Sequence, residues 1–343
     1  MESPRILVIR LTALGDVVLV EPVARALRDR FPDATIDLVT EARVAPLMAR
    51  AAGFDQVIGY DRRGRHAGWS GITRLLRALP HQRYDLVIDL QGKLRTRVLA
   101  ARLGSPRRVV LRKRGLFAAL RALFGDDPPL TARHSVQIYL DALAPLGLPA
   151  GSSAEAPRLS VPRPARDPGV LRVGLGIGTT HATKRWPSER FAELATLIAG
   201  AHPAARFVPI GGAEDRALID RFRAGVDPRL LEPVDTPALD LVALSELLGG
   251  LDLLLGVDSG PAHLAAALGV PVLVLFGPTS PRRWGPIGAQ HRSVSLELDC
   301  SPCSNTGSAR CPRADRDHAC MRDLGVARVW QEAQAMITAL RDR

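Results

Sequence analysis

The sequence predicts an α/β protein of two doubly wound halves, each built on a parallel β-sheet. Three observations support this fold class. Short apolar runs typical of buried strands alternate with segments of helical spacing along the chain. A Pro-rich stretch, residues 150–169, interrupts the alternation once, after which it restarts. Polar turns follow several of the expected strands, and alternating strands and helices form parallel sheets covered on both faces.

The elements follow one another in a regular order. In the N-terminal half we expect strands at residues 5–10, 35–39, 56–58, 84–90 and 107–111, and helices at 17–30 and 45–52. In the C-terminal half we expect strands at 170–174, 206–210, 251–256 and 270–276, and helices at 188–201, 215–224, 264–268 and 326–340. The predicted domains are therefore 1–160 and 161–343. The amphipathic last helix is a candidate to pack back on the N-terminal domain.

Length and composition limit the classes of protein to which the chain can belong. The chain has 343 residues, of which 46% are hydrophobic, enough for two packed cores. No apolar run reaches the roughly 18 residues that a membrane-spanning helix needs. The N-terminus enters a strand pattern at once and lacks the features of a signal peptide. We therefore expect a cytoplasmic protein.

The charge of the chain is concentrated in one segment. The formal net charge is +11, and residues 61–133 carry 17 Lys and Arg against 5 Asp and Glu. A basic segment favours an anionic partner, such as nucleic acid, an acidic membrane surface, or an acidic glycan or lipid. The alternative is high Arg usage throughout the chain. Aromatic residues make up 4% of the chain and do not alternate with basic ones, which argues against single-stranded nucleic acid.

The turn at residues 257–263 is the most informative stretch of the chain. A buried strand ends there in Asp258, Ser259 and Gly260, and a short helix begins at once. Ser259 is placed to cap this helix, and Pro261 suits its first turn. A helix N-terminus at the carboxyl edge of a parallel sheet commonly binds phosphate. We therefore expect an anionic ligand, with a nucleotide as the first candidate. His263 in the first turn faces either this ligand or the sheet.

Two further turns in the C-terminal half could also bind parts of a nucleotide ligand. Residues 174–187 combine glycines with Thr179, Thr180 and Lys184, whose hydroxyl and ammonium groups suit a diphosphate, although no Walker motif is present. The turn with Gly211 and Gly212 would let a base or ribose lie against the backbone. Turns that follow parallel strands converge on one crevice. A plain polar loop is the alternative interpretation of residues 174–187.

Asp16 is the candidate base in the N-terminal half. It opens a helix just after the first strand, where doubly wound folds place functional groups, and its carboxylate could accept a proton from a hydroxyl. An ordinary acidic residue at a helix start is the alternative. The turn lacks the G-x-G-x-x-G fingerprint of dinucleotide-binding proteins.

The four cysteines lie close together in the sequence. Cys300, Cys303, Cys311 and Cys320 form a C-x2-C-x7-C-x8-C pattern, with His318 nearby. This clustering indicates a structural zinc site, while reduced thiols or two disulfides are the alternatives. A catalytic metal is disfavoured, because four thiolates leave no open position.

In this order, the motifs resemble those of glycosyltransferase family nine, the lipopolysaccharide heptosyltransferases. The similarity rests mainly on residues 10–16, 89–92, 184–187, 211–215 and 256–263, and also on 276–279 and the cysteine segment; it extends from about residue 4 to 325. It implies a GT-B fold, in which two Rossmann-like domains face a central cleft. The N-terminal domain would then bind the acceptor and the C-terminal domain the nucleotide sugar.

The resemblance also implies a reaction and a set of site residues. The expected enzyme is an inverting glycosyltransferase that moves heptose from ADP-L-glycero-D-manno-heptose to the inner core of lipopolysaccharide, either Kdo-lipid A or the heptosylated core. Asp16 would be the catalytic base, and no cofactor is required for catalysis. The expected donor-binding residues are Thr179, Thr180, Lys184, Gly211, Gly212, Asp258, Ser259, Gly260 and His263.

The resemblance also implies a partner for the basic segment. An anionic acceptor at the cytoplasmic face of the inner membrane would bind Arg95, Arg97, Arg112, Lys113 and Arg114, and the protein would contact that membrane surface peripherally. Within the family, a different sugar donor or glycan acceptor is the alternative. More remote alternatives are an NAD(P)-linked oxidoreductase and a non-enzymatic nucleic-acid binder.

Overall fold

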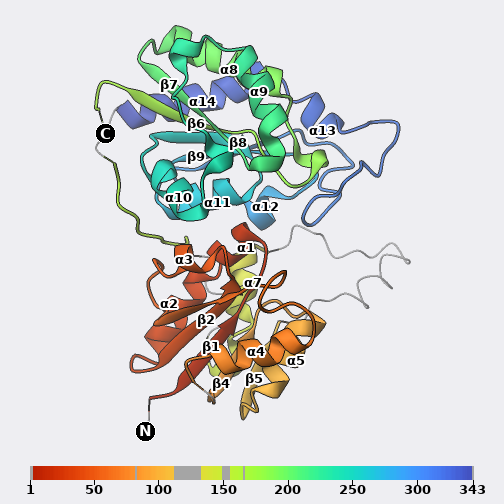
Figure 1. Ribbon diagram of the computed structural model, residues 1–343. Coiled ribbons are helices and arrows are strands. Elements are labelled where there is room, and N and C mark those ends of the chain that lie inside the picture. Colours follow the sequence, from red (N-terminus) through yellow and green to blue (C-terminus); the bar gives the residue numbers. More distant parts are fainter. Residues whose placement is uncertain (1–2, 82, 112–132, 149–154, 165–166, 342–343) are drawn as a thin grey trace. The chain divides into compact units, whose positions relative to one another are not determined.

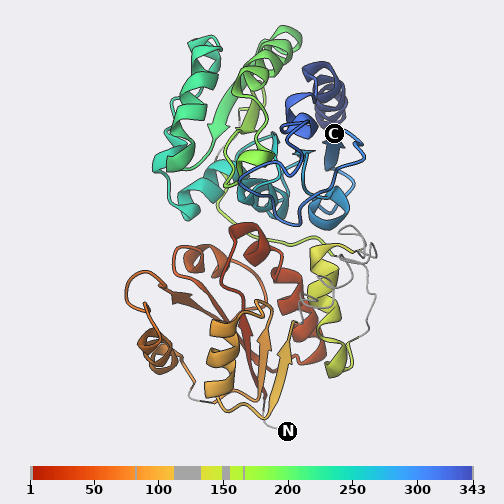
Figure 2. The same ribbon diagram turned by 90° about the vertical axis from the view of Figure 1, so that its right-hand side faces the viewer.

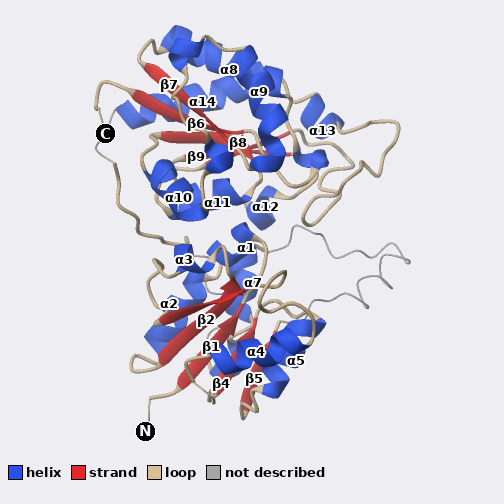
Figure 3. Cartoon of the chain, viewed as in Figure 1, coloured by secondary structure: helices blue, strands red, loops and turns tan. Residues whose placement is uncertain are grey.

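The computed structural model describes residues 3–81, 83–111, 133–148, 155–164 and 167–341 (Figure 1, Figure 2). The chain divides into two compact units. Unit 1 comprises Met1–Pro128 and Ser135–Ser160, and unit 2 comprises Pro129–His134 and Val161–Arg343. Each unit contains one five-stranded parallel sheet flanked by helices (Figure 3). No helix in the described ranges is long and apolar enough to cross a membrane.

The sheet of unit 1 has the strand order β3-β2-β1-β4-β5. Its strands are β1 (Arg5–Ile9), β2 (Thr35–Glu41), β3 (Gln56–Tyr60), β4 (Leu86–Asp89) and β5 (Arg107–Val110). All five strands predicted for this half are therefore confirmed, with shifted ends. The helices are α1 (Leu14–Val18), α2 (Glu21–Arg30), α3 (Ala45–Met48), α4 (Ser70–Ala78), α5 (Leu94–Arg102) and α7 (Ser135–Asp141), with a short 3-10 turn, η1 (Ala144–Leu146).

One predicted helix of unit 1 is in fact two. The sequence indicated a single helix at 17–30, but the chain turns between α1 and α2, and Pro22 lies in the first turn of α2. Proline suits that position because its missing N–H would be unpaired there in any case. As a result, α1 is a short helix that begins at Leu14, before Asp16, and places Asp16 in its first turn.

The sheet of unit 2 has the order β10-β9-β8-β6-β7. Its strands are β6 (Leu171–Gly176), β7 (Ala205–Ile210), β8 (Leu253–Val257), β9 (Val272–Phe276) and β10 (Arg292–Ser295). The helices are α8 (Ser188–Ala201), α9 (Arg216–Ala224), α10 (Leu241–Gly249), α11 (Gly260–Ala267), α12 (Pro281–Trp284), α13 (Ala319–Arg322) and α14 (Val326–Arg341). Single 3-10 turns are η2 (Ala182–Lys184), η3 (Ala213–Asp215), η4 (Pro228–Leu230) and η5 (Thr236–Ala238).

The last helix belongs to unit 2. Helix α14 packs along α8, and its residues Val329, Ala333 and Ile337 are fully buried in the same core as Phe191 (Figure 1). The sequence made this helix a candidate to pack on the N-terminal domain. Its apolar face is instead buried within unit 2.

Parallel strands bring their carboxyl ends to one edge of each sheet, and the turns that follow them carry the predicted site residues. Two neighbouring strands approach unusually closely at this edge of unit 2. A Cβ atom on Gly256 of β8 would lie 2.8 Å from the Cα atom of Gly176 on β6. Glycine at both positions therefore lets the turns after β6 and β8 begin side by side.

Candidate active site

The predicted base, Asp16, lies in a fixed environment in unit 1. The hydroxyl of Tyr139 donates a 2.6 Å hydrogen bond to its Oδ1 atom, and Nη2 of Arg10 forms a 2.6 Å ion pair with the same oxygen. The Oδ2 atom accepts a longer, 3.3 Å hydrogen bond from the backbone N–H of Ala13. Oδ1 is thus saturated, while Oδ2 has capacity for a further donor.

Both partners of Asp16 are themselves held in place. Arg10 and Tyr139 are 4% and 3% exposed. Nη1 of Arg10 donates to the carbonyl of Leu90 at 2.6 Å, and the guanidinium lies 5.1 Å from the centre of the Tyr139 ring. Because the side chains that contact Asp16 are buried and anchored, the carboxylate has little freedom to rotate.

The turn after β4 supports the loop that leads to Asp16. Oε1 of Gln91 accepts hydrogen bonds from the N–H groups of Leu11 and Thr12 at 3.2 and 3.3 Å. Asp89, which is fully buried, accepts from the N–H groups of Gln91 and Gly92, both at 2.9 Å. Burial raises the pKa of Asp89 despite these bonds. Residues 89–92 therefore stabilise the backbone of Leu11 and Thr12, where the loop that leads to Asp16 begins.

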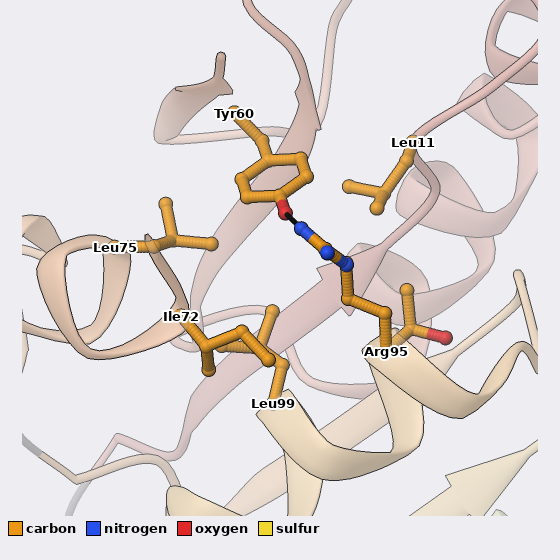
Figure 4. A pocket seen from close by; sticks show the side chains of 7 residues that line it. Leu11, Tyr60, Ile72, Leu75, Arg95 and Leu99 are labelled. Atoms are coloured by element: carbon orange, nitrogen blue, oxygen red, sulfur yellow. Dashed lines mark hydrogen bonds between the residues drawn. The ribbon is translucent and has the colours of Figure 1, made fainter. Parts of the chain in front are cut away.

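The predicted acceptor residues divide into three groups. Arg95 is half-buried, donates a 2.5 Å hydrogen bond to the hydroxyl of Tyr60, and helps to line a cavity of about 10 Å³ (Figure 4). A cavity of that volume holds no more than about one water molecule. Arg97 is exposed on α5. Arg112, Lys113 and Arg114 lie outside the described residues, so their role as acceptor contacts stays a prediction.

Unit 2 contains a buried ion pair after β8. Nζ of Lys184 lies 2.9 Å from Oδ2 of Asp258, and Oγ1 of Thr279 donates to the same oxygen at 2.6 Å. Nε2 of His263 lies 3.7 Å from Oδ1. Burial tends to raise the pKa of Asp258, but the neighbouring His263 and Lys184 side chains outweigh it and hold the pKa well below its usual range.

Helix α11 begins at this ion pair. Ser259 occupies the N-cap position, but its hydroxyl makes no capping bond and is without a partner in the described part of the chain. The prediction that its side chain caps the helix is therefore wrong. The hydroxyl and the first N–H groups of α11 stand next to Lys184 and His263, an arrangement that suits a phosphate.

The turns after β6 and β7 adjoin the Asp258 turn, because β7, β6 and β8 are neighbours in the sheet. Thr179 is buried and Thr180 exposed, whereas Gly211 and Gly212 are intermediate. Asp215 belongs to the 211–215 motif but was not among the predicted site residues; it is 3% exposed and accepts a 3.0 Å hydrogen bond from the N–H of Gly212. Burial raises the pKa of Asp215.

A loop that the sequence did not connect with the site packs against it. The N–H groups of Cys303 and Ser304 donate to the carbonyl of Pro278 at 3.0 and 2.9 Å, next to Thr279. Oγ1 of Thr183 donates to the carbonyl of Ser308 at 2.8 Å and accepts from its N–H at 3.1 Å. This loop, residues 300–311, therefore lines one side of the Lys184 segment, and we call it the cysteine loop.

The four cysteines have free thiols, of which Cys303 is exposed and the others are intermediate. Burial raises the pKa of Cys320 to about 11. In the described ranges, which include all four cysteines, no three His, Cys, Asp or Glu side chains are grouped as metal ligands. The structural zinc site stays a prediction, which metal analysis of the purified protein would test.

Comparison with known proteins defines the class first. The fold is that of the GT-B glycosyltransferases. A family 9 glycosyltransferase from Veillonella parvula superimposes with a TM-score of 0.79 at 22% identity, covering 100% of this chain and 99% of the other. E. coli ADP-heptose lps heptosyltransferase II gives a TM-score of 0.75 at 22% identity, covering 98% and 99%.

Residues 72–311, well over half of the chain, match the family model described as glycosyltransferase family 9 (heptosyltransferase). The chain belongs to this family and is a glycosyltransferase. It is 29% identical to lipopolysaccharide heptosyltransferase 1 of Pseudomonas aeruginosa, over 98% of both chains. It is 28% identical to lipopolysaccharide heptosyltransferase 1 of E. coli K12, over 83% of this chain and 91% of the other. Family membership favours glycosyl transfer over the oxidoreductase and nucleic-acid-binding alternatives.

Proposed function

We propose that the protein transfers heptose from ADP-L-glycero-D-manno-heptose, with inversion, to the inner core of lipopolysaccharide. Two kinds of similarity support this. The two relatives described above are named lipopolysaccharide heptosyltransferases. Structures of similar fold include E. coli heptosyltransferase WaaC with ADP and with ADP-2-deoxy-2-fluoro heptose. The observation that carries the proposal is the arrangement around Asp16, whose Oδ1 atom is held while Oδ2 can accept a proton.

In the proposed reaction, Oδ2 of Asp16 accepts the proton of an acceptor hydroxyl as its oxygen attacks the anomeric carbon of the heptose. The bond from that carbon to the diphosphate oxygen breaks, and ADP leaves with the electron pair. Attack from the face opposite to ADP inverts the anomeric centre. Arg10 and Tyr139 keep the carboxylate in position for this step.

The donor would bind to unit 2. Lys184 and the N–H groups at the start of α11 would stabilise the negative charge that develops on the leaving diphosphate. Thr179, Thr180, Ser259 and His263 supply hydrogen-bonding groups at the same edge of the sheet, and Asp258 orients the Lys184 ammonium. Gly211 and Gly212 would lie against the nucleoside. The reaction as proposed needs no metal ion or other cofactor.

The acceptor would bind to the N-terminal domain. We propose that its phosphates and carboxylates contact Arg95, Arg97, Arg112, Lys113 and Arg114, because the basic segment matches an anionic acceptor. Such an acceptor, Kdo-lipid A or its heptosylated form, lies at the cytoplasmic face of the inner membrane. The protein would work there as a cytoplasmic enzyme in peripheral contact with that face.

Isothermal titration calorimetry with ADP-heptose and with ADP tests the donor half of the proposal. Lys184→Met should weaken the binding of both about tenfold or more, since it removes a charge-assisted contact with phosphate. Lys93→Met, at an exposed lysine of unit 1, is the matched control and should leave binding unchanged. If ADP-heptose does not bind while another nucleotide sugar does, the enzyme is a family 9 transferase with a different donor.

A further inference from the structure

Unit 1 exposes two large apolar side chains where α4 and α5 begin. In the described part of the chain, the exposed large hydrophobic residues are Trp69, Leu94 and Leu197, at 54%, 69% and 39%. Trp69 is the N-cap residue of α4, and Leu94 is the first residue of α5. Leu197 lies apart from them, on α8 of unit 2.

Side-chain contacts join the two helix starts into one surface. The guanidinium of Arg95, the residue after Leu94, lies 5.5 Å from the centre of the Trp69 ring. Further along the helices, Nη1 of Arg102 donates to Oγ1 of Thr73 at 3.3 Å. Trp69 and Leu94 therefore flank the same arginine, on neighbouring helices (Figure 1).

This surface lies at the carboxyl edge of the sheet, the edge that carries Asp16. Arg95 contacts the hydroxyl of Tyr60, the last residue of β3, and lines the same small cavity as Leu11, which follows β1 (Figure 4). Leu94 follows the end of β4 by a few residues. The apolar groups thus lie at the same edge of the sheet as the end of β1, from which the Asp16 loop emerges.

The surroundings of the two apolar side chains are strongly basic. The sequence has no Asp or Glu at residues 62–84 or 90–111. The nearest acid in sequence before Trp69 is Asp61, and its carboxylate already accepts the N–H groups of Gly64 and Arg65 at 2.8 and 2.9 Å. The exposed cations of these segments include Arg62, Arg63, Arg65, Arg74, Lys93 and Arg97. We call Trp69, Leu94 and these cations the α4–α5 surface.

We propose that the α4–α5 surface docks unit 1 onto a lipid bilayer that contains anionic lipids. An exposed tryptophan and an exposed leucine in segments rich in exposed cations match the bilayer interface, where the indole and the apolar chain enter the head-group layer. Long Arg and Lys side chains reach the lipid phosphates, each contributing a modest attraction that salt weakens. A single exposed tryptophan offers no series of stacking partners, which favours lipid over single-stranded nucleic acid.

This inference extends the proposed function, because docking at this edge would bring a lipid-borne acceptor to Asp16. Its test does not depend on that function. The protein is sedimented with vesicles of phosphatidylcholine that contain phosphatidylglycerol, and with vesicles of phosphatidylcholine alone. We expect binding only to the anionic vesicles, decreasing as salt rises. Emission from Trp69 should shift to the blue on binding, since Trp186 and Trp284 are already buried and Trp330 is half-buried.

The decisive variant is Trp69→Ser combined with Leu94→Ser. It should bind anionic vesicles about tenfold more weakly, with an unchanged circular dichroism spectrum because both side chains are exposed. Leu197→Ser removes the third exposed apolar side chain and should bind like the wild type. Equal vesicle binding by the double variant and the wild type would overturn the proposal, as would equal binding to vesicles without phosphatidylglycerol.

Two further measurements distinguish lipid docking from nucleic-acid binding and from a damaged donor site. If a single-stranded DNA oligonucleotide loses affinity for the double variant while anionic vesicles do not, the surface belongs to a nucleic-acid partner and the proposal is wrong. ADP-heptose binding by calorimetry should be the same in the double variant and the wild type. Loss of vesicle binding with intact donor binding supports docking, whereas absence of donor binding in the wild type contradicts the proposed function alone.

Discussion

The hydroxyl of Tyr139 lies 2.6 Å from Oδ1 of Asp16, although 123 residues separate the two in the sequence. Together with Arg10, this contact fixes one oxygen of the carboxylate and leaves the other for a proton donor. The orientation of the proposed base thus depends on a side chain from α7, which lies late in the sequence of unit 1.

Replacing Tyr139 by phenylalanine should therefore slow the reaction. The change Tyr139→Phe removes a hydrogen bond to a charged group, which is worth about 1.5–3 kcal/mol, so kcat should fall about tenfold or more. The Kd for ADP-heptose should not change, because the proposed donor site lies in unit 2. Rates of ADP release and calorimetric titrations measure the two quantities.

A second tyrosine of unit 1 supplies the matched control. Tyr84 donates a buried hydrogen bond of 2.8 Å to Oδ2 of Asp37, which resembles the contact of Tyr139 with Asp16 but involves no proposed site residue. Tyr84→Phe should lower Tm and leave kcat of the folded enzyme unchanged. Equal losses of kcat in the two variants would mean that Tyr139 acts only through the stability of unit 1.

The buried ion pair of unit 2 predicts a non-additive pair of substitutions. Lys184→Met leaves the carboxylate of Asp258 buried without its cation and should cost about 3 kcal/mol of unfolding free energy. The double variant Lys184→Met/Asp258→Asn removes both charges and should recover part of this loss. Urea denaturation of the wild type, both single variants and the double variant measures the coupling. Additive losses would contradict a direct interaction between the two side chains.

The cysteine loop should influence donor binding through Gly307. This residue has φ +95°, and a Cβ atom there would lie 2.7 Å from Cε of Lys184. Gly307→Ala should strain the loop and displace the Lys184 ammonium, and we expect the affinity for ADP to fall about tenfold. Gly200→Ala is the control, because α8 has open space at that position and alanine favours a helix. Unchanged ADP affinity in Gly307→Ala would show that the loop does not set the position of Lys184.

Stability should fall as the pH drops from about 6.5 to about 4. Burial lowers the pKa of His291 from 6.5 to about 4, and its Nδ1 atom accepts a 3.2 Å hydrogen bond from the N–H of Val272. Between these values the unfolded chain binds a proton that the folded chain does not, so protonation favours unfolding. The full contribution, about 3 kcal/mol, is present above pH 6.5. Denaturation at several pH values should show a smaller slope for His291→Asn than for the wild type; equal slopes would contradict this.

Nine of the ten described strands could be predicted because they are dense apolar runs bounded by polar turns. Strand β10, with the sequence Arg-Ser-Val-Ser, could not, since it is a short edge strand with one buried residue, Val294. The turn before Pro22 could not be predicted, because the apolar residues on both sides of it follow one helical spacing and indicated a single helix at residues 17–30.

Some residues of the candidate site could likewise be predicted from the sequence, and others could not. Asp16, Lys184 and Asp258 could be identified because each follows a strand in a turn whose chemistry is visible locally. The partners that orient them could not, because Tyr139 lies in a segment for which the sequence indicated no motif, helix or strand, and no helix or strand was expected in the cysteine loop. Their roles come from contacts between segments far apart in sequence, such as Thr183 with Ser308. No local pattern encodes such pairs.

The most direct test of heptosyl transfer with Asp16 as the base is acceptor-dependent release of ADP. Purified protein would be given ADP-heptose with and without Kdo-lipid A or its heptosylated form, with Asp16→Asn measured beside the wild type. We expect the wild type to release ADP only when an acceptor is present, and Asp16→Asn to lose this activity by about a hundredfold or more while still binding ADP-heptose. Release by Asp16→Asn at the wild-type rate would contradict the role of Asp16, and failure of the wild type to bind ADP-heptose would contradict the proposed donor.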